Sequence, residues 1–202
     1  GVGAGPFHSQ TNEAWFTKTP GLKVVYPAFP ADAKGLLCAS INDPNPVLFF
    51  EHKALYRSIY QDVSEDYYTI EIGVASLLKE GNDITIITYG AGVHWALDTL
   101  KTHPNISADL IDLRTLQPLD EVAIFTSVKK TGKVIFLQED SLFGSISSDV
   151  SALITENCFE FLDAPVKRVA SIETPIPFQG ELEKQYLPKH RFAFELKTLI
   201  DY

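Results

Sequence analysis

An apolar run in the middle of the chain reads Ile84-Thr85-Ile86-Ile87-Thr88-Tyr89 and stops at Gly90. Its β-branched residues are typical of a buried strand, and the glycine marks a turn. The segment that follows spaces four apolar residues along one face of a helix: Val93, Ala96, Leu97 and Leu100. A buried strand that leads into an amphipathic helix predicts an α/β fold.

The same alternation extends in both directions from this run. Toward the C-terminus we expect strands at 110–113, 134–137 and 166–172, with helices around 122–128, 146–158 and 192–200. Toward the N-terminus we expect strands at 24–26 and 47–50, a helix over 30–42 and a polar linker within 53–82. Right-handed crossovers between such strands give a mostly parallel sheet with helices on both faces.

The composition is that of an ordinary globular protein. The chain has 202 residues, of which 45% are hydrophobic and 21% charged, so it can hold one large domain or two small ones. Its 26 acidic and 17 basic residues give a net charge of -9 without a basic cluster, which argues against nucleic-acid binding. No apolar run approaches the ~20 residues that a membrane-spanning helix needs, so we expect no membrane partner.

Two further features concern the context of the chain. Methionine is absent, and the opening residues Gly1-Val2-Gly3-Ala4-Gly5-Pro6 are typical of a loop interior. We therefore expect a piece of a longer polypeptide. The two cysteines, Cys38 and Cys158, match neither a disulfide framework nor a metal motif, so we expect free thiols in a reducing compartment.

The glycine-rich start leads to the first candidate for chemistry. It is not a dinucleotide fingerprint, because no strand precedes it and Pro6 follows where a helix would open. His8 comes next, where an imidazole could donate to an oxygen or transfer a proton near neutral pH. The alternative is a surface or structural histidine. A short helix through 15–16 follows, for which Ser9 or Thr11 is the expected N-cap.

Other polar residues gather where predicted elements end. Asp112-Leu113-Arg114 ends a strand and forms either a buried Asp112–Arg114 ion pair or a ligand contact. Gln138-Glu139-Asp140 ends the next strand and leaves the same alternatives. Ser40, Asp43 and Asn45 cluster at the end of a predicted helix, where they either make turn hydrogen bonds or hold a hard cation. The remaining histidines lack the spacing of zinc ligands.

Ordered runs over nearly the whole chain match those of a known family: His8-Ser9-Gln10, Glu13-Ala14-Trp15-Phe16, Pro20-Gly21-Leu22-Lys23-Val24-Val25, Ala33-Lys34-Gly35-Leu36-Leu37, Asp43-Pro44-Asn45-Pro46, Leu55-Tyr56-Arg57, Asp112-Leu113-Arg114-Thr115-Leu116, Lys130-Thr131-Gly132-Lys133-Val134 and Ala164-Pro165-Val166-Lys167-Arg168-Val169. With these runs the sequence resembles the beta subunit of the thiamine-diphosphate-dependent 2-oxo acid dehydrogenases. Phe49-Phe50-Glu51 and the ending Leu199-Ile200-Asp201-Tyr202 are more similar to the branched-chain enzymes than to the pyruvate enzymes.

The resemblance implies two domains. Residues 1–66 resemble the second half of a pyrimidine-binding domain, and residues 67–202 resemble a transketolase C-terminal domain. In the family, the first half of the pyrimidine-binding domain carries the glutamate that activates the aminopyrimidine and the aromatic residue that stacks on it. The resemblance therefore assigns no cofactor-binding residue to this chain, and we expect the chain alone to be inactive.

The resemblance also implies a reaction and a site. A branched-chain 2-oxo acid, 3-methyl-2-oxobutanoate, is oxidatively decarboxylated and its acyl group passes to lipoyl, with thiamine diphosphate and Mg²⁺ as cofactors. His8 matches the family histidine that faces the cofactor from the beta subunit. Ser40, Asp43 and Asn45 match a loop that holds a structural monovalent cation, usually potassium, whose upstream half is not in this chain.

The implied partners are an alpha subunit or a fused alpha part, a second beta copy in an α2β2 enzyme, and a lipoyl-bearing acyltransferase. Such enzymes are cytoplasmic in bacteria and lie in the mitochondrial matrix of eukaryotes. The sequence departs from the family at Gln138, where relatives often have histidine, and at Gly144-Ser145, where a paired glycine is common. The alternatives to a branched-chain enzyme are a pyruvate dehydrogenase beta subunit and a non-catalytic assembly domain.

Overall fold

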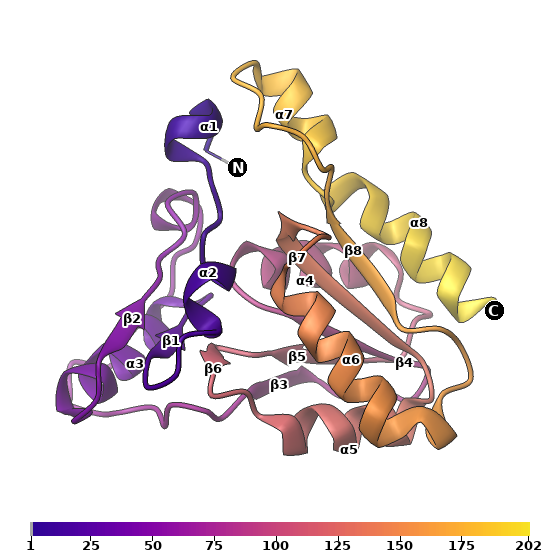
Figure 1. Ribbon diagram of the computed structural model, residues 1–202, viewed down its shortest axis with the longest axis horizontal. Helices are drawn as coiled ribbons and strands as arrows, with labels where there is room; N and C mark the ends of the chain where they lie inside the picture. Colours follow the sequence, from indigo (N-terminus) through magenta and orange to yellow (C-terminus); the bar gives the residue numbers. More distant parts are fainter. Residues whose placement is uncertain (1) are drawn as a thin grey trace.

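The computed structural model describes residues 2–202, which form a small N-terminal block and a larger C-terminal block (Figure 1). The N-terminal block contains α1 (Gly5–His8), α2 (Ala14–Thr17), β1 (Lys23–Val25), α3 (Pro30–Asn42), β2 (Val47–Phe49) and the 3₁₀ helix η1 (Leu55–Arg57). The C-terminal block contains β3 (Ser76–Lys79), β4 (Ile84–Thr88), α4 (Ala91–Thr102), β5 (Ala108–Asp112), β6 (Thr115–Gln117), α5 (Glu121–Thr131), β7 (Val134–Ser141), α6 (Ile146–Cys158), the 3₁₀ helix η2 (Phe159–Phe161), β8 (Lys167–Ser171), α7 (Gly180–Tyr186) and α8 (Lys189–Ile200).

The C-terminal block is built on a five-stranded sheet of order β3-β5-β4-β7-β8. Strand β4 pairs in parallel with β5 and β7, and β7 pairs in parallel with β8. Only the edge strand β3 runs antiparallel to its neighbour β5. All five residues of β4 are buried, as expected for a central strand that is covered on both faces. The predicted mostly parallel α/β sheet is therefore confirmed.

Alternate strand residues face two separate cores. Ile87 and Phe136 point into a core that α5 and α6 close, whereas Ile86 and Leu137 point into a core that α4 and α8 close. This alternation follows from the two-residue period of a strand. Near-continuous apolar runs such as 84–87 are needed here because both faces of the sheet bury side chains.

The sheet of the N-terminal block takes one strand from the C-terminal block. Its order is β2-β1-β6, in which β1 runs parallel to β2 and antiparallel to β6. Val24 is the register partner of Gln117, and Val25 is the partner of Thr115. Figure 1 places β6 at the junction of the two blocks, beside β1. The pairing of β1 with β6 therefore fixes the position of one block relative to the other at this junction.

Several predicted elements agree with the structure, and one predicted cap is wrong. The predicted bounds of α3 and α6 are confirmed. Helix α2 has Glu13 as its N-cap without a side-chain cap bond. Ser9 Oγ instead accepts the backbone N–H of Ala4, and Thr11 Oγ1 donates to Asp140. Among residues 2–202, no helix has the length and apolar character needed to cross a membrane.

Candidate functional site

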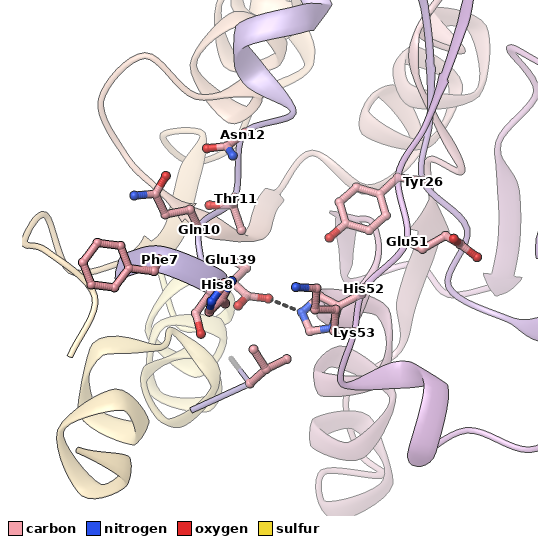
Figure 2. Close-up of a pocket in the computed structure, with 12 residues that line it drawn as sticks. Phe7, His8, Gln10, Thr11, Asn12, Tyr26, Glu51, His52, Lys53 and Glu139 are labelled. Atoms are coloured by element: carbon pink, nitrogen blue, oxygen red, sulfur yellow. Dashed lines mark hydrogen bonds and ion pairs between the residues drawn. The ribbon is translucent and has the colours of Figure 1, made fainter. Parts of the chain in front are cut away.

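His8 borders a cavity of about 240 Å³ between the two blocks (Figure 2). The cavity is lined by residues 7–12, by 51–53 after β2, by Tyr26 after β1 and by Glu139 on β7, with Val2 at its edge. His8 is the last residue of α1, which starts with Pro6 in its first turn. Its imidazole is exposed and has no hydrogen-bond partner among the described residues. The ring is therefore available to a ligand in the cavity.

The position of α1 depends on Gly5. Gly5 has a φ of +60°, and a Cβ atom placed on it would lie 2.5 Å from the ring of Phe178. Only glycine adopts this backbone geometry at such close approach without strain. The neighbouring Phe7 ring packs 5.9 Å from the Phe178 ring, measured between centroids. Phe178, in the segment before α7, thus packs against the short helix that carries His8. Gly1, the first glycine of this loop, lies outside the described residues.

Two hydrogen bonds fasten the segment around His8 to the C-terminal block. The backbone N–H of Gly3 donates to Oε1 of Glu183, which lies on helix α7, at 2.9 Å. Thr11 Oγ1 donates to Oδ1 of Asp140, which lies at the end of β7, at 3.2 Å. Glu183 is itself buried, whereas Gly3 is exposed, so the first contact is partly buried. His8 lies between these two anchors in the sequence.

A histidine–carboxylate pair forms the opposite wall of the cavity. His52 Nε2 lies 2.6 Å from Glu139 Oε2, and both side chains are 8% exposed. The backbone N–H of Ala54 donates to His52 Nδ1 at 3.2 Å, so Nδ1 is an acceptor and the ring proton sits on Nε2. Burial raises the pKa of Glu139, but the hydrogen bond from His52 opposes burial and helps to bring that pKa below its ordinary value.

A second buried acid lies behind the His8 segment. Glu13 is 1% exposed, and Tyr89 donates its hydroxyl to Glu13 Oε1 at 2.8 Å. Burial raises the pKa of Glu13 to about 7, although hydrogen bonds oppose this effect. Burial likewise raises the pKa of Tyr89 well above its ordinary value, so the phenol stays a donor. At neutral pH this carboxyl is divided between its neutral and charged forms.

The three residues at the end of β7 have different roles. Gln138 is fully buried; its Oε1 accepts the N–H of Ser147 at 3.0 Å and its Nε2 donates to Ser141 O at 2.8 Å. Gln138 thus holds the loop between β7 and α6 and does not line the cavity. Glu139 does line the cavity, and Asp140 anchors Thr11.

Arg114 joins the blocks but does not pair with the acid that the sequence indicated. Its guanidinium Nη1 lies 3.2 Å from Asp32 Oδ1 on α3, and its Nη2 donates to Val74 O at 2.9 Å. The expected ion pair with Asp112 is wrong, because Asp112 Oδ1 accepts the backbone N–H of Arg114 instead. Asp112 Oδ2 has no partner among the described residues. Burial, the largest influence, raises the pKa of Asp112 to about 8.

The residues expected at a cation are engaged with protein groups. Asp43 forms an ion pair with Lys23 and accepts the backbone and side-chain N–H groups of Asn45 at 2.9 and 3.0 Å. Ser40 Oγ donates to Leu36 O within its own helix at 2.7 Å. These side chains alone do not form a cage for potassium. Residues 2–202 also contain no cluster of three His, Cys, Asp or Glu side chains that could hold a metal ion.

Sequence reasoning singled out His8 and the Glu139 strand end but missed His52 in the cavity wall and the buried Glu13–Tyr89 contact near it. Glu13 and Tyr89 are 76 residues apart, and His52 and Glu139 are 87 residues apart. Neither pair has a local spacing that marks it. The one available signal was Glu13 itself, an acid directly before the apolar residues Ala14, Trp15 and Phe16.

Comparison with known families divides the chain in two. The transketolase C-terminal domain family matches residues 73–191. The transketolase pyrimidine binding domain family matches residues 1–58.

Three relatives are beta subunits of different enzymes from Bacillus subtilis. The 2-oxoisovalerate dehydrogenase subunit beta is 48% identical over 190 residues, which cover 93% of this chain and 58% of the relative. The subunit beta of acetoin:2,6-dichlorophenolindophenol oxidoreductase is 46% identical over 190 residues, with 93% and 55% covered. The subunit beta of the pyruvate dehydrogenase E1 component is 45% identical over 198 residues, with 96% and 60% covered. The chain thus spans just over half the length of these relatives.

A solved structure has the same fold. It is a split-gene transketolase described as an inactive beta4 tetramer, with a TM-score of 0.76 and 24% identity. The match covers 94% of this chain and 61% of that one.

Proposed function

This chain belongs to the transketolase C-terminal domain family and is a relative of the beta subunits of 2-oxo acid dehydrogenases, and from this premise we propose that it acts in a thiamine-diphosphate-dependent 2-oxo acid dehydrogenase. Its reaction is the oxidative decarboxylation of 3-methyl-2-oxobutanoate with transfer of the acyl group to lipoyl. The observation that carries the proposal is the exposed imidazole of His8, which borders the cavity between the blocks.

His8 is the catalytic residue of this proposal. Thiamine diphosphate supplies the carbanion chemistry when it is bound. The imidazole of His8 orients the substrate carboxylate or donates a proton during acyl transfer. The wall formed by His52 and Glu139 fixes the shape of the cavity that faces it.

The partners follow from the same premise. We propose an alpha subunit or a fused alpha part, a second copy of the beta chain, and a lipoyl-bearing acyltransferase. We also propose that the domain boundary lies at residues 66–67. Potassium remains a prediction at Ser40, Asp43 and Asn45, where backbone carbonyls must complete the ligand set. A higher melting temperature in potassium chloride than in choline chloride would support this ion.

Two other functions are carried by specific observations. The relatives that are named for pyruvate and acetoin are nearly as similar as the one named for 2-oxoisovalerate, which favours keeping pyruvate as the alternative substrate. A non-catalytic assembly domain is the second alternative, because the chain covers only 55–60% of the length of these relatives.

The test is turnover by the full assembly. The enzyme is given pyruvate and 3-methyl-2-oxobutanoate in parallel, and kcat/KM is compared for acylation of a lipoyl domain. A branched-chain enzyme prefers 3-methyl-2-oxobutanoate by tenfold or more, whereas preference for pyruvate selects the alternative. Calorimetry of the isolated chain with magnesium thiamine diphosphate is the control, and tight binding there would contradict the expectation that this chain alone is inactive.

A further inference from the structure

Glu13 makes a buried contact between the two blocks directly behind the cavity. It follows His8 by five positions and is the N-cap of α2. Its carboxyl is 1% exposed and bonds to Tyr89 at the end of β4. Neither residue lines the cavity, so the contact is not made for direct binding of a ligand.

The surroundings of Glu13 are unfavourable for a charged carboxylate. From β1 it is faced by Tyr26, from the end of β4 by Tyr89, and from β7 by Glu139 and Asp140. The rings of Tyr26 and Tyr89 pack with centroids 5.4 Å apart. None of these groups is a cation. A carboxylate here loses its hydration and meets two like charges, so ionisation favours any arrangement that returns it to water.

The segment that carries His8 depends on a few contacts of this kind. Its imidazole has no partner of its own, and the bonds of Gly3 and Thr11 to the C-terminal block are single hydrogen bonds. Glu13 is the most deeply buried anchor of the segment. Loss of the contact between Glu13 and Tyr89 would detach the C-terminal end of the segment that carries His8. His8 would then lose its position at the cavity.

We propose that Glu13 is a positioning residue, which holds His8 over the cavity through its hydrogen bond with Tyr89 and releases this hold when its carboxyl ionises. The inference rests on the proposed function only for its kinetic readout. An open segment exposes Glu13 to water, where its pKa is that of an ordinary carboxyl. The equilibrium constant for opening of the segment therefore increases between about pH 4.5 and about pH 7, and it is constant at higher pH. The full change is at most on the order of a hundredfold.

The test is hydrogen exchange of the assembled enzyme over pH 5.5 to 8.5, read as the protection factor of a peptide that spans residues 3–13. In the wild type we expect protection to fall up to pH 7 and to stay constant above it. Glu13→Gln keeps the acceptor but cannot ionise, so its protection stays at the acid-side value at every pH. Tyr89→Phe removes the donor and lowers protection at least fivefold at pH 5.5. Tyr60→Phe is the matched control, because Tyr60 is 86% exposed and far from Glu13 in the sequence.

The kinetic readout separates positioning from simple packing. Tyr89→Phe is expected to lower kcat for lipoyl acylation about tenfold while KM changes less than twofold. Glu13→Gln should retain kcat and lose the pH dependence of the wild type between 6 and 7.5, and Glu13→Ala should lose kcat at every pH. A purely structural role gives equal losses for Gln and Ala with an unchanged pH profile, which overturns the proposal.

The exchange arm needs no substrate, so it decides the inference even if the enzyme turns over no 2-oxo acid. Unchanged protection in Glu13→Gln at pH 8 overturns the proposal, whatever the reaction is. If Tyr89→Phe does not fold, the comparison of Glu13→Gln with the wild type still gives the answer.

Discussion

His52 and Glu139 are held 2.6 Å apart although 87 residues separate them in the chain. One follows β2 in the N-terminal block and the other lies on β7 in the C-terminal block. The pair spans the junction at the cavity wall, and its two side chains are nearly closed to water. It therefore couples the shape of the site to the docking of one block on the other.

Removing the imidazole of this pair should destabilise the fold. His52→Ala leaves the buried Glu139 carboxylate without that donor, which costs about 2–4 kcal/mol. Urea unfolding of the wild type and the variant measures the difference. His190→Ala, at an exposed histidine, is the control and should stay within ~0.5 kcal/mol. Equal midpoints for the two variants would show that the pair is energetically neutral.

Substitution of His8 should separate activity from stability. His8→Ala removes an exposed side chain without a partner, so the free energy of unfolding should change by less than ~0.5 kcal/mol. Acyl transfer to lipoyl in the full complex should fall on the order of a hundredfold. His8→Asn tests a structural role, because an amide keeps hydrogen bonding without proton transfer. Normal lipoyl acylation by His8→Ala removes this residue from the mechanism.

The strained start of α1 should tolerate no side chain at Gly5. Gly5→Ala places a methyl group against Phe178, which moves α1 and His8, and a shift of about 1 Å can cost up to a hundredfold in rate. Steady-state kinetics of the full enzyme measure the loss. Gly21→Ala is the matched control, since Gly21 also has a positive φ but has open space around its Cα. The double variant Gly5→Ala with Phe178→Ala should regain part of the activity; no recovery would mean that backbone strain alone causes the loss.

The pH dependence of stability should reveal Asp112. Its pKa is about 8 in the folded chain and near 3.8 when unfolded, so its burial lowers stability progressively as pH rises between these values. Asp112→Asn keeps an acceptor for the N–H of Arg114 and cannot ionise. The free energy of unfolding of the variant should therefore equal that of the wild type at pH 4 and be about 3–5 kcal/mol larger at pH 9.

Denaturant unfolding at the two pH values measures this change. Asp98→Asn is the control at an exposed position of α4 and should leave the profile unchanged. A constant difference between Asp112→Asn and wild type at both pH values would exclude Asp112 as the titrating group.

Local patterns in the sequence predicted some elements because those elements are stabilised locally. Pro30 opens α3 and Asp43-Pro44 closes it, so both ends are readable from the chain alone. Helix α6 has apolar residues at helical spacing over its full length. Strand β6 is only three residues long, and its partner β1 lies about 90 positions upstream, so no local period marks it. The three- or four-residue spacing that marks a helix face is absent in such distant pairs.

The site was less predictable because its contacts are long-range. His8 was singled out by its place after the glycine-rich start and then matched to a family histidine. The structure places it at the edge of the cavity, and its catalytic role stays a prediction. Thr11 was expected to cap α2, but its hydroxyl donates a hydrogen bond to Asp140 instead. Arg114 was expected to meet its neighbour Asp112, but Asp32 lies closer once α3 docks against the connection at Val74. In each case a partner from a distant segment replaced the local one.

Strand β6 joins the two blocks through backbone hydrogen bonds in addition to the covalent link between them. Its register with Val24 and Val25 ties residues 115–117 to the first block. A single proteolytic nick in the mostly exposed stretch 60–67 would therefore leave two polypeptides joined through one shared sheet. Residues 67–202 produced without β1 would instead present a bare strand edge, which is prone to self-association. Mixing the two pieces tests whether this shared sheet is sufficient for their association.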